Sequence, residues 1–451
     1  SFSRPGIVRQ LREGTRSTEN FPRKMGAKTS SQQAVPLKNA AEPGEQHLVV
    51  TVGVVPRPMP AAGETLRRVL AENRHFAPVL RGGSICNHYS MGMLAAHGLG
   101  ADDKQLAYLH HFLEGRSRAP HDAADTTRKE ATRGGEGWTW GLGQMTSMSA
   151  MRGFFLEELQ EKGLDATLRA YLPRLILGQH KGLFHPMIRL KFGMLSPCDP
   201  LEEIAEALAY SYGRYQPIFP SAPDRFAAEL ATVDEVQETV DESTQALLEG
   251  RIHKAWARLR QMYKARGFNG RKNTMGILAE LYEDEALHGV SLEGFPVDPA
   301  SAAEGHLLAT QLAAQLYKYQ PGLTTLHAIT GAHAVSDILP KLPSGARVAS
   351  AKLYFLWLSC LFVEKGCPQL RFFSHGAELV AAGAWQRVRD RALEPLCEGS
   401  GHSHEEGEGS GEEPQVHVLK LAFTCERLFE RSAHPIYLDI AKKVVGEGKP
   451  W

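Results

Sequence analysis

The chain has 451 residues, and its apolar fraction of 43% is ordinary for a globular protein with a large core. Its formal net charge is zero, so nothing in the overall charge indicates a nucleic acid or an anionic surface as a partner. The six cysteines contain no CxxC pair, which favours reduced thiols in a cytoplasmic protein over a disulfide scaffold. No apolar run reaches about 18 residues, so the sequence predicts no transmembrane helix.

The first 45 residues are rich in Arg, Ser and Gly and lack apolar periodicity, which predicts a disordered N-terminal extension over residues 1–45. They contain no apolar core of a signal peptide, although an Arg- and Ser-rich opening is also compatible with a transit peptide. A sharper reading is that the segment from Met25 to Ser30 matches the myristoylation pattern M-G-x-x-x-[ST]. Gly26 is then the lipidation candidate if translation starts at Met25, and one myristoyl chain gives only weak membrane association.

Helical periodicity dominates the chain after a β-branched run at residues 47–55, which predicts a short strand or an extended segment. The most apolar of the expected helices, residues 348–363, should be central. We expect helices at residues 64–73, 90–99, 103–113, 154–175, 200–212, 225–230, 245–263, 278–288, 302–318, 324–339, 348–363 and 416–429.

Two segments between these helices are polar and Gly-rich. Residues 116–137 predict a loop, and residues 398–414 form an acidic Gly-rich stretch that predicts a flexible insertion. With so little strand signal, the fold class is mainly α, as one large multi-helix, bundle-like domain over residues 46–451.

The most informative stretch runs from Thr325 to Val335 and holds two histidines, His327 and His333, in an otherwise apolar run of small residues. Imidazole is the commonest metal ligand in proteins and is costly to bury without a partner. On a regular helix, six residues turn by about 600°, so these two rings point roughly 120° apart. Either the helix is interrupted near Gly331, or the histidines face different sides of a cavity. Two core histidines bonded to the backbone explain this stretch equally well.

Other residues join these histidines as site candidates. His88 lies near the first turn of an expected helix, and His185 precedes a proline that should hold it in extended geometry. Lys420 lies in an apolar helical run one turn after His417, so both side chains could face one cavity. His306 leads another expected helix and could line a pocket. The alternatives are a helix-entry role for the histidines and a surface-reaching side chain for the lysine.

In order along the chain, these pieces resemble the questin oxidase-like family. The resemblance rests on Asn87-His88-Tyr89-Ser90, Gly98-Leu99-Gly100-Ala101, His185-Pro186-Met187-Ile188, the stretch from His327 to Ala334, and His417-Val418-Leu419-Lys420. It covers roughly residues 46 to 445. Fungal members oxidatively open an anthraquinone ring in polyketide pathways, and one branch is similar to a non-haem iron dioxygenase with four histidines and a carboxylated lysine.

The resemblance implies that His88, His185, His327 and His333 hold Fe²⁺, with Lys420 as the carboxylated ligand. His306 and His417 are then neighbours of the site or line its pocket. A lysine carbamate supplies a negative charge that four neutral imidazoles lack, and five protein ligands leave one octahedral position for O2 or substrate. The acidic insertion before Lys420 and the first 45 residues depart from the family pattern.

Three functions follow as hypotheses. The first is an iron-dependent oxygenase, an oxidoreductase that cleaves a C–C bond in an aromatic or quinone-like small molecule with O2. The second is a Baeyer–Villiger-type monooxygenase that uses NADPH without bound metal. Because the sequence has no dinucleotide-binding fingerprint, an external partner would supply its reductant. The third is a non-catalytic helical binding protein on the same fold.

Overall fold

In the computed structural model, the described residues are 57–80, 86–114, 118–120, 137–139, 141–233, 242–265, 273–283, 289–290, 292, 294–295, 297–370, 383–397 and 413–446. The predicted N-terminal extension with Gly26, the predicted extended segment at 47–55 and nearly all of the predicted insertion at 398–414 lie outside these residues.

The described part of the chain is mainly helical, which confirms the predicted fold class. Its α-helices in chain order are α1 (Glu64–Asn73), α2 (Tyr89–Leu99), α3 (Asp103–Glu114), α5 (Met148–Lys162), α6 (Leu164–Leu175), α7 (His185–Leu195), α8 (Pro200–Gly213), α9 (Ala222–Arg225), α10 (Ala227–Ala231), α11 (Glu242–Ala265), α12 (Thr274–Glu283), α14 (Ala302–Tyr319), α15 (Leu323–Ile338), α16 (Ser344–Glu364), α17 (Ala384–Leu393), α18 (Glu413–Ser432) and α19 (Pro435–Gly446).

The predicted junction between α2 and α3 shows how local sequence sets a helix boundary. Gly100 ends α2 in a left-handed conformation with φ of 100°, which glycine adopts without a Cβ penalty. Asp102 then caps α3, because its Oδ1 accepts a hydrogen bond from the backbone N–H of Gln105 at 2.8 Å. The Gln105 Oε1 accepts from the N–H of Asp102 in return at 3.0 Å, which completes a capping box.

Some predicted boundaries were wrong. The single helix expected at 154–175 is two helices, because Gly163 with φ of 80° separates α5 from α6. The helix expected at 225–230 is broken at Phe226, between α9 and α10. Strand β1 (Phe76–Leu80) was not expected, and it pairs antiparallel with β2 (Arg118–Pro120), which lies inside the predicted loop 116–137.

Helices α7, α17 and α19 were also absent from the prediction. For α7, the sequence indicated that Pro186 would hold His185 in extended geometry, and this was wrong, since His185 is the first residue of the helix. Proline fits the first turn of a helix, where its missing N–H has no intrahelical partner. The backbone therefore turns at the residues before His185, and not at the proline after it.

Helix α16 is central, as its apolar sequence predicted. It is long and apolar enough by composition to cross a membrane, but 89% of its most apolar window is buried inside the protein. Trp256 of α11 stacks on Phe362 of this helix with ring centroids 4.2 Å apart, and its indole N–H donates to Ser359 Oγ. These contacts are those of a core helix surrounded by other helices.

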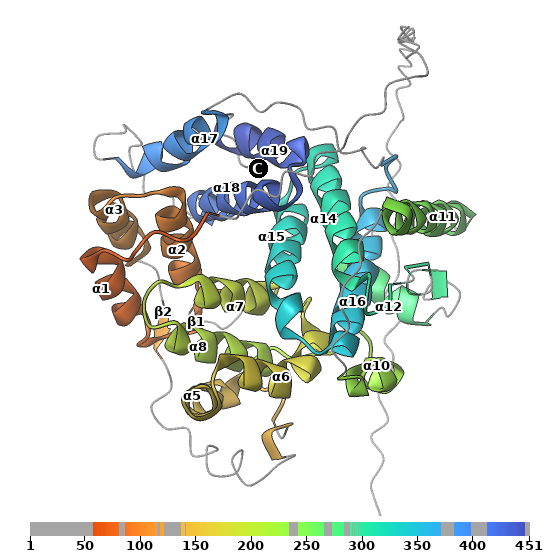
Figure 1. Ribbon diagram of the computed structural model, residues 1–451, viewed down its shortest axis with the longest axis horizontal. Helices are drawn as coiled ribbons and strands as arrows, with labels where there is room; N and C mark the ends of the chain where they lie inside the picture. The colour runs from red at the N-terminus through yellow and green to blue at the C-terminus, as the bar shows by residue number, and fades with distance from the viewer. Residues whose placement is uncertain are drawn as a thin grey trace, which may run out of the picture. The chain divides into compact units, whose positions relative to one another are not determined.

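Four helices form a closed ring of contacts that positions the site. Helix α2 packs against α7, α7 against α15, α15 against α18, and α18 against α2. Figure 1 shows α15 facing α7 on one side and α18 on another, with α2 reaching between those two. The N-terminal parts of these helices are thus brought together from distant parts of the chain.

Candidate metal centre

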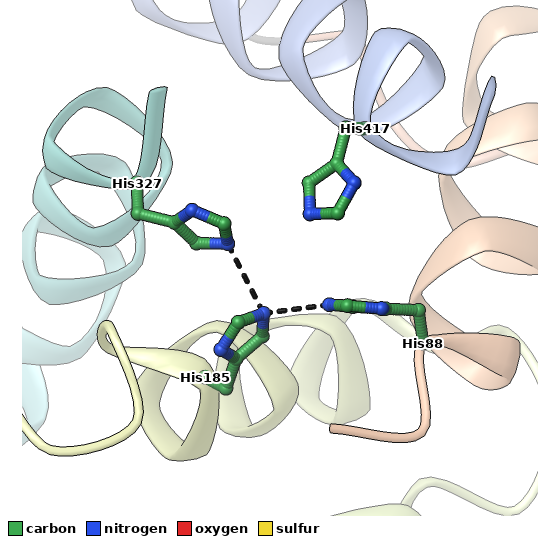
Figure 2. A group of neighbouring side chains, drawn as sticks. All are labelled: His88, His185, His327 and His417. Atoms are coloured by element: carbon green, nitrogen blue, oxygen red, sulfur yellow. Dashed lines mark hydrogen bonds between the residues drawn. The ribbon is translucent and has the colours of Figure 1, made fainter. Parts of the chain in front are cut away.

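Four buried histidines meet inside this ring, one from each helix. His88 immediately precedes α2, and His185 begins α7. His327 lies on α15 and His417 on α18. One ligand nitrogen from each ring lies within 4.8 Å of all the others. Figure 2 shows the four rings converging on a common centre.

The hydrogen bonds of His185 and His327 fix which ring nitrogen faces the centre. The Nδ1 of His327 lies 2.8 Å from the carbonyl oxygen of Leu323, and the Nδ1 of His185 contacts the carbonyl oxygen of Gly182. A carbonyl oxygen only accepts, so each Nδ1 carries the hydrogen and donates it. In the neutral rings, each Nε2 then holds a lone pair. The two Nε2 atoms lie 3.1 Å apart.

His88 and His417 complete the group. The Nε2 of His88 lies 2.6 Å from the Nε2 of His185, so three Nε2 atoms crowd together. The ring of His417 meets those of His88 and His327 edge-on, with centroids 4.8 Å and 5.2 Å away. The group is therefore a cage of nitrogen atoms, not a stack of rings.

Burial lowers the pKa of three of these histidines, His88, His185 and His327. It lowers the pKa of His327 to about 3, and the positive charge of Lys420 adds to this effect. It also lowers the pKa of His88 and His185 well below the usual value of 6.5, and the neighbouring charged groups act in the same direction. His88, His185 and His327 are therefore neutral at neutral pH, which metal binding by imidazole requires.

Lys420 lies beside the cage, as the sequence indicated. It is fully buried on α18, one turn after His417. Its charge is near enough to lower the pKa of His88, His185 and His327. An ammonium at this place would repel a bound cation, whereas a carbamate on the same side chain would attract it.

His333 does not join the group, so its prediction as a neighbour of His327 in the cage needs correction. Helix α15 runs without interruption through Gly331, and six residues of a regular helix turn the two rings roughly 120° apart. His333 instead accepts a hydrogen bond at Nδ1 from the Lys191 ammonium at 3.0 Å, and its Nε2 lies 3.4 Å from Asp337. His417, predicted only as a neighbour, takes the fourth place in the cage.

The other pocket candidate, His306, is a buried core histidine. Its Nε2 lies 2.8 Å from the carbonyl oxygen of Ala332, and its ring packs edge-on against Tyr354. It belongs to none of the metal-compatible groups among the described residues. The alternative of an ordinary core histidine therefore holds for His306.

A buried arginine next to the cage links α7 to the residues that flank His88 and to α8. Arg189, one turn after His185, donates to the carbonyl oxygen of Asn87 at 2.6 Å and to Ser90 Oγ at 3.2 Å. It also pairs with Glu206 at 3.0 Å, and all these groups are buried. Burial raises the pKa of Glu206 to about 7 although Arg189 opposes the shift. Sequence patterns gave no sign of this arginine, which ties α7 to the turn that carries His88.

The donor set fits a transition metal. Neutral imidazole suits iron, zinc, copper and nickel. Two nitrogen ligands on opposite sides of one ion, each at about 2.1 Å, are about 4.2 Å apart. Since the four nitrogens already lie within 4.8 Å of one another, shifts of tenths of an ångström would let them share an ion.

Comparison with known proteins identifies a family over the part of the chain that carries these residues. The model of the family described as Questin oxidase-like matches residues 85–421, well over half of the chain. All four histidines of the cage and Lys420 fall within this match. No curated protein matches the sequence.

Proposed function

This chain belongs to the questin oxidase-like family, and from that premise we propose that it is an Fe²⁺-dependent oxygenase. Its reaction would cleave a C–C bond of an aromatic or quinone-like small molecule with O2. The family name indicates oxidase or oxygenase activity in general terms. The observation that carries the iron proposal is the pair of Nε2 atoms of His185 and His327, which face each other with their Nδ1 hydrogens engaged elsewhere.

The residues that would hold the metal are His88, His185, His327 and His417, with Lys420 as a carbamate. When bound, Fe²⁺ supplies the one-electron chemistry that allows O2 to react with an organic substrate. Carbamate formation joins the Lys420 amine to CO2 through a new N–C bond and releases one proton. The product carries a negative charge where an ammonium would repel the metal, and its oxygen is a suitable ligand.

The protein's own part is to exclude water and hold the ligands. The four imidazoles are 7% exposed or less, and Lys420 is fully buried. The Nδ1–H groups of His185 and His327 are held by backbone carbonyls, which fixes each ring's orientation and increases the electron density on Nε2. A site prepared in this way needs little rearrangement when it takes up an ion.

The proposed cleavage balances in two ways. If both oxygen atoms of O2 enter the product, a C=C bond becomes two carbonyl groups and no other reductant is needed. If only one atom enters, the second leaves as water, and an external donor must supply two electrons and two protons. NADPH through a partner would be such a donor.

The test is incubation of Fe²⁺-loaded protein with a series of anthraquinones under ¹⁸O2, with products analysed by mass spectrometry. We expect a ring-opened product that carries ¹⁸O, and none after exhaustive chelation. Activity that needs NADPH and survives chelation would instead support a metal-free Baeyer–Villiger-type monooxygenase. A protein that binds anthraquinones but never consumes O2 would support the non-catalytic alternative.

A further inference from the structure

The backbone just before His185 adopts an unusual conformation. Three successive residues, Gly182, Leu183 and Phe184, have positive φ angles of 57°, 53° and 64°. Glycine adopts this region readily, but Leu and Phe do so at an energetic cost. Such a conformation persists only where the surrounding structure enforces it, and it is commonest at functional sites.

The same turn fixes the ring of His185. The carbonyl oxygen of Gly182 accepts from the Nδ1–H of His185, and it also accepts from the His185 backbone N–H at 3.2 Å. One carbonyl therefore holds both the main chain and the ring of this histidine. If the turn relaxed, the ring would lose the bond that directs its Nε2 toward His327.

Phe184 anchors the turn against α15. Its side chain is fully buried, and its ring meets Trp357 edge-on with centroids 4.8 Å apart. On the other side it packs directly on Gly331, where an added Cβ would lie 2.6 Å from the Phe184 Cγ. Real Cβ atoms essentially never come so close, so only glycine at position 331 allows this contact.

Two contacts join the start of α7 to α15: His185 meets His327, and Phe184 packs on Gly331. In each contact the residues from the same helix are close together in sequence. Phe184 directly precedes His185, and Gly331 lies four residues after His327 on the same face of α15. The seat of Phe184 on Gly331 thus sets how His185 approaches His327. This gives Gly331 a role quite different from the helix interruption that the sequence suggested.

We propose that Phe184, seated on Gly331, is the positioning residue that aims Nε2 of His185 into the histidine cage. The inference rests on the proposed metal centre and adds a device that controls its geometry. Neither Phe184 nor Gly331 has a side-chain atom that could bind a metal. They act through the left-handed turn at Gly182–Phe184.

The experiment compares Co²⁺ binding by purified full-length variants, because the visible absorption of bound Co²⁺ reports the number and arrangement of its ligands. In Gly331→Ala, the new methyl group displaces Phe184, and we expect the Kd for Co²⁺ to rise by about tenfold or more, the range found when groups that orient a ligand are lost. The Co²⁺ spectrum should shift toward that of His185→Ala. Gly153→Ala in α5 is the matched control, since an added Cβ there meets nothing within 4 Å.

A second variant covers the case in which Gly331→Ala does not fold. Phe184→Leu keeps a branched side chain on the same backbone but loses the ring contacts with Trp357 and Tyr354. We expect a smaller rise in Kd and a spectral change in the same direction. A merely structural role would lower thermal stability without altering the spectrum of the bound ion, and that result would overturn the inference.

The outcomes separate this inference from the proposed function. If the wild type binds Co²⁺ and both variants keep its Kd and its spectrum, the positioning role of Phe184 is overturned. The proposed metal centre is then unaffected. Wild-type protein that binds neither Co²⁺ nor Fe²⁺ overturns the metal centre and the inference with it.

Discussion

The Nε2 atoms of His185 and His327 lie 3.1 Å apart, although the two residues are separated by 142 positions in the chain. Both rings already donate their Nδ1 hydrogens to backbone carbonyls, and burial opposes a second proton on either ring. Two lone pairs at this distance repel each other unless a cation lies between them. The arrangement explains why these histidines are better read as metal ligands than as core residues bonded to the backbone.

The first prediction separates the two histidines that compete for the fourth position. His417→Ala should lower the metal content of the purified protein to a small fraction of one ion per chain, because it removes a nitrogen of the cage. His333→Ala should keep wild-type metal content, because His333 contacts Lys191 and Asp337 instead. Elemental analysis of both proteins checks this. Loss of metal in His333→Ala with retention in His417→Ala would reverse the assignment.

The second prediction concerns the modification of Lys420. Protein equilibrated with ¹³C-bicarbonate should show a carbamate carbon signal by NMR, and Lys420→Met should abolish both this signal and tight metal binding. The matched control is Lys191→Met, which removes a second fully buried lysine, this one on α7. Burial lowers the pKa of Lys191 to about 7, so it too offers a neutral amine. A signal that survives in Lys420→Met and vanishes in Lys191→Met would place the carbamate on Lys191.

The third prediction is a pH dependence of stability from His306. Burial lowers its pKa to about 4 in the folded state, against 6.5 in the unfolded chain. Below pH 6.5, the unfolded state therefore binds a proton that the folded state excludes. The free energy of unfolding should fall by about 1.1 kcal/mol per pH unit between pH 6 and pH 4.5 from this residue alone.

The variant His306→Gln isolates this contribution, since its amide can still donate to the carbonyl oxygen of Ala332. Urea unfolding in the presence of a chelator, at several pH values, should give a shallower acid slope for the variant than for the wild type. Parallel slopes would show that His306 takes up its proton equally in both states.

The fourth prediction concerns the buried ion pair between Arg189 and Glu206. Arg189→Met leaves the carboxylate of Glu206 buried without its partner, which should lower the free energy of unfolding by about 3 kcal/mol or more. The double variant Arg189→Met, Glu206→Leu should recover part of this loss, because it removes one of the two buried carboxylates that Arg189 compensates, the other being Glu203. Urea unfolding measures both. A double variant no more stable than the single one would mean that Arg189 acts mainly through its other partners, Glu203, Asn87 and Ser90.

The sequence allowed much of the helical architecture to be predicted, and the reasons for the failures are local. Apolar content located α14, α15 and α16 well, because these helices are buried on nearly every side. It missed α7, because the residues that start this helix are held by tertiary packing. Left-handed Leu183 and Phe184 have no sequence signature, since most other contexts would place them in ordinary conformations.

For the site, sequence reasoning named the residues that meet but not all of their roles. His88, His185 and His327 lie together as expected. The exchange of His333 for His417 has a simple cause: the order of motifs carries no information about which way a side chain faces. Helical spacing does carry this information. The six-residue spacing of His327 and His333 points their side chains apart, and the three-residue spacing of His417 and Lys420 places theirs on one face of a helix.

The ring of α2, α7, α15 and α18 has a consequence for the order of events in folding. Each helix contributes one histidine, and the first and last are separated by most of the chain. A metal ion cannot nucleate this fold from a short segment, as zinc does in a small finger domain. During synthesis, the ring closes only after α18 with His417 has been made, so metal uptake would be a late step that stabilises a structure already formed.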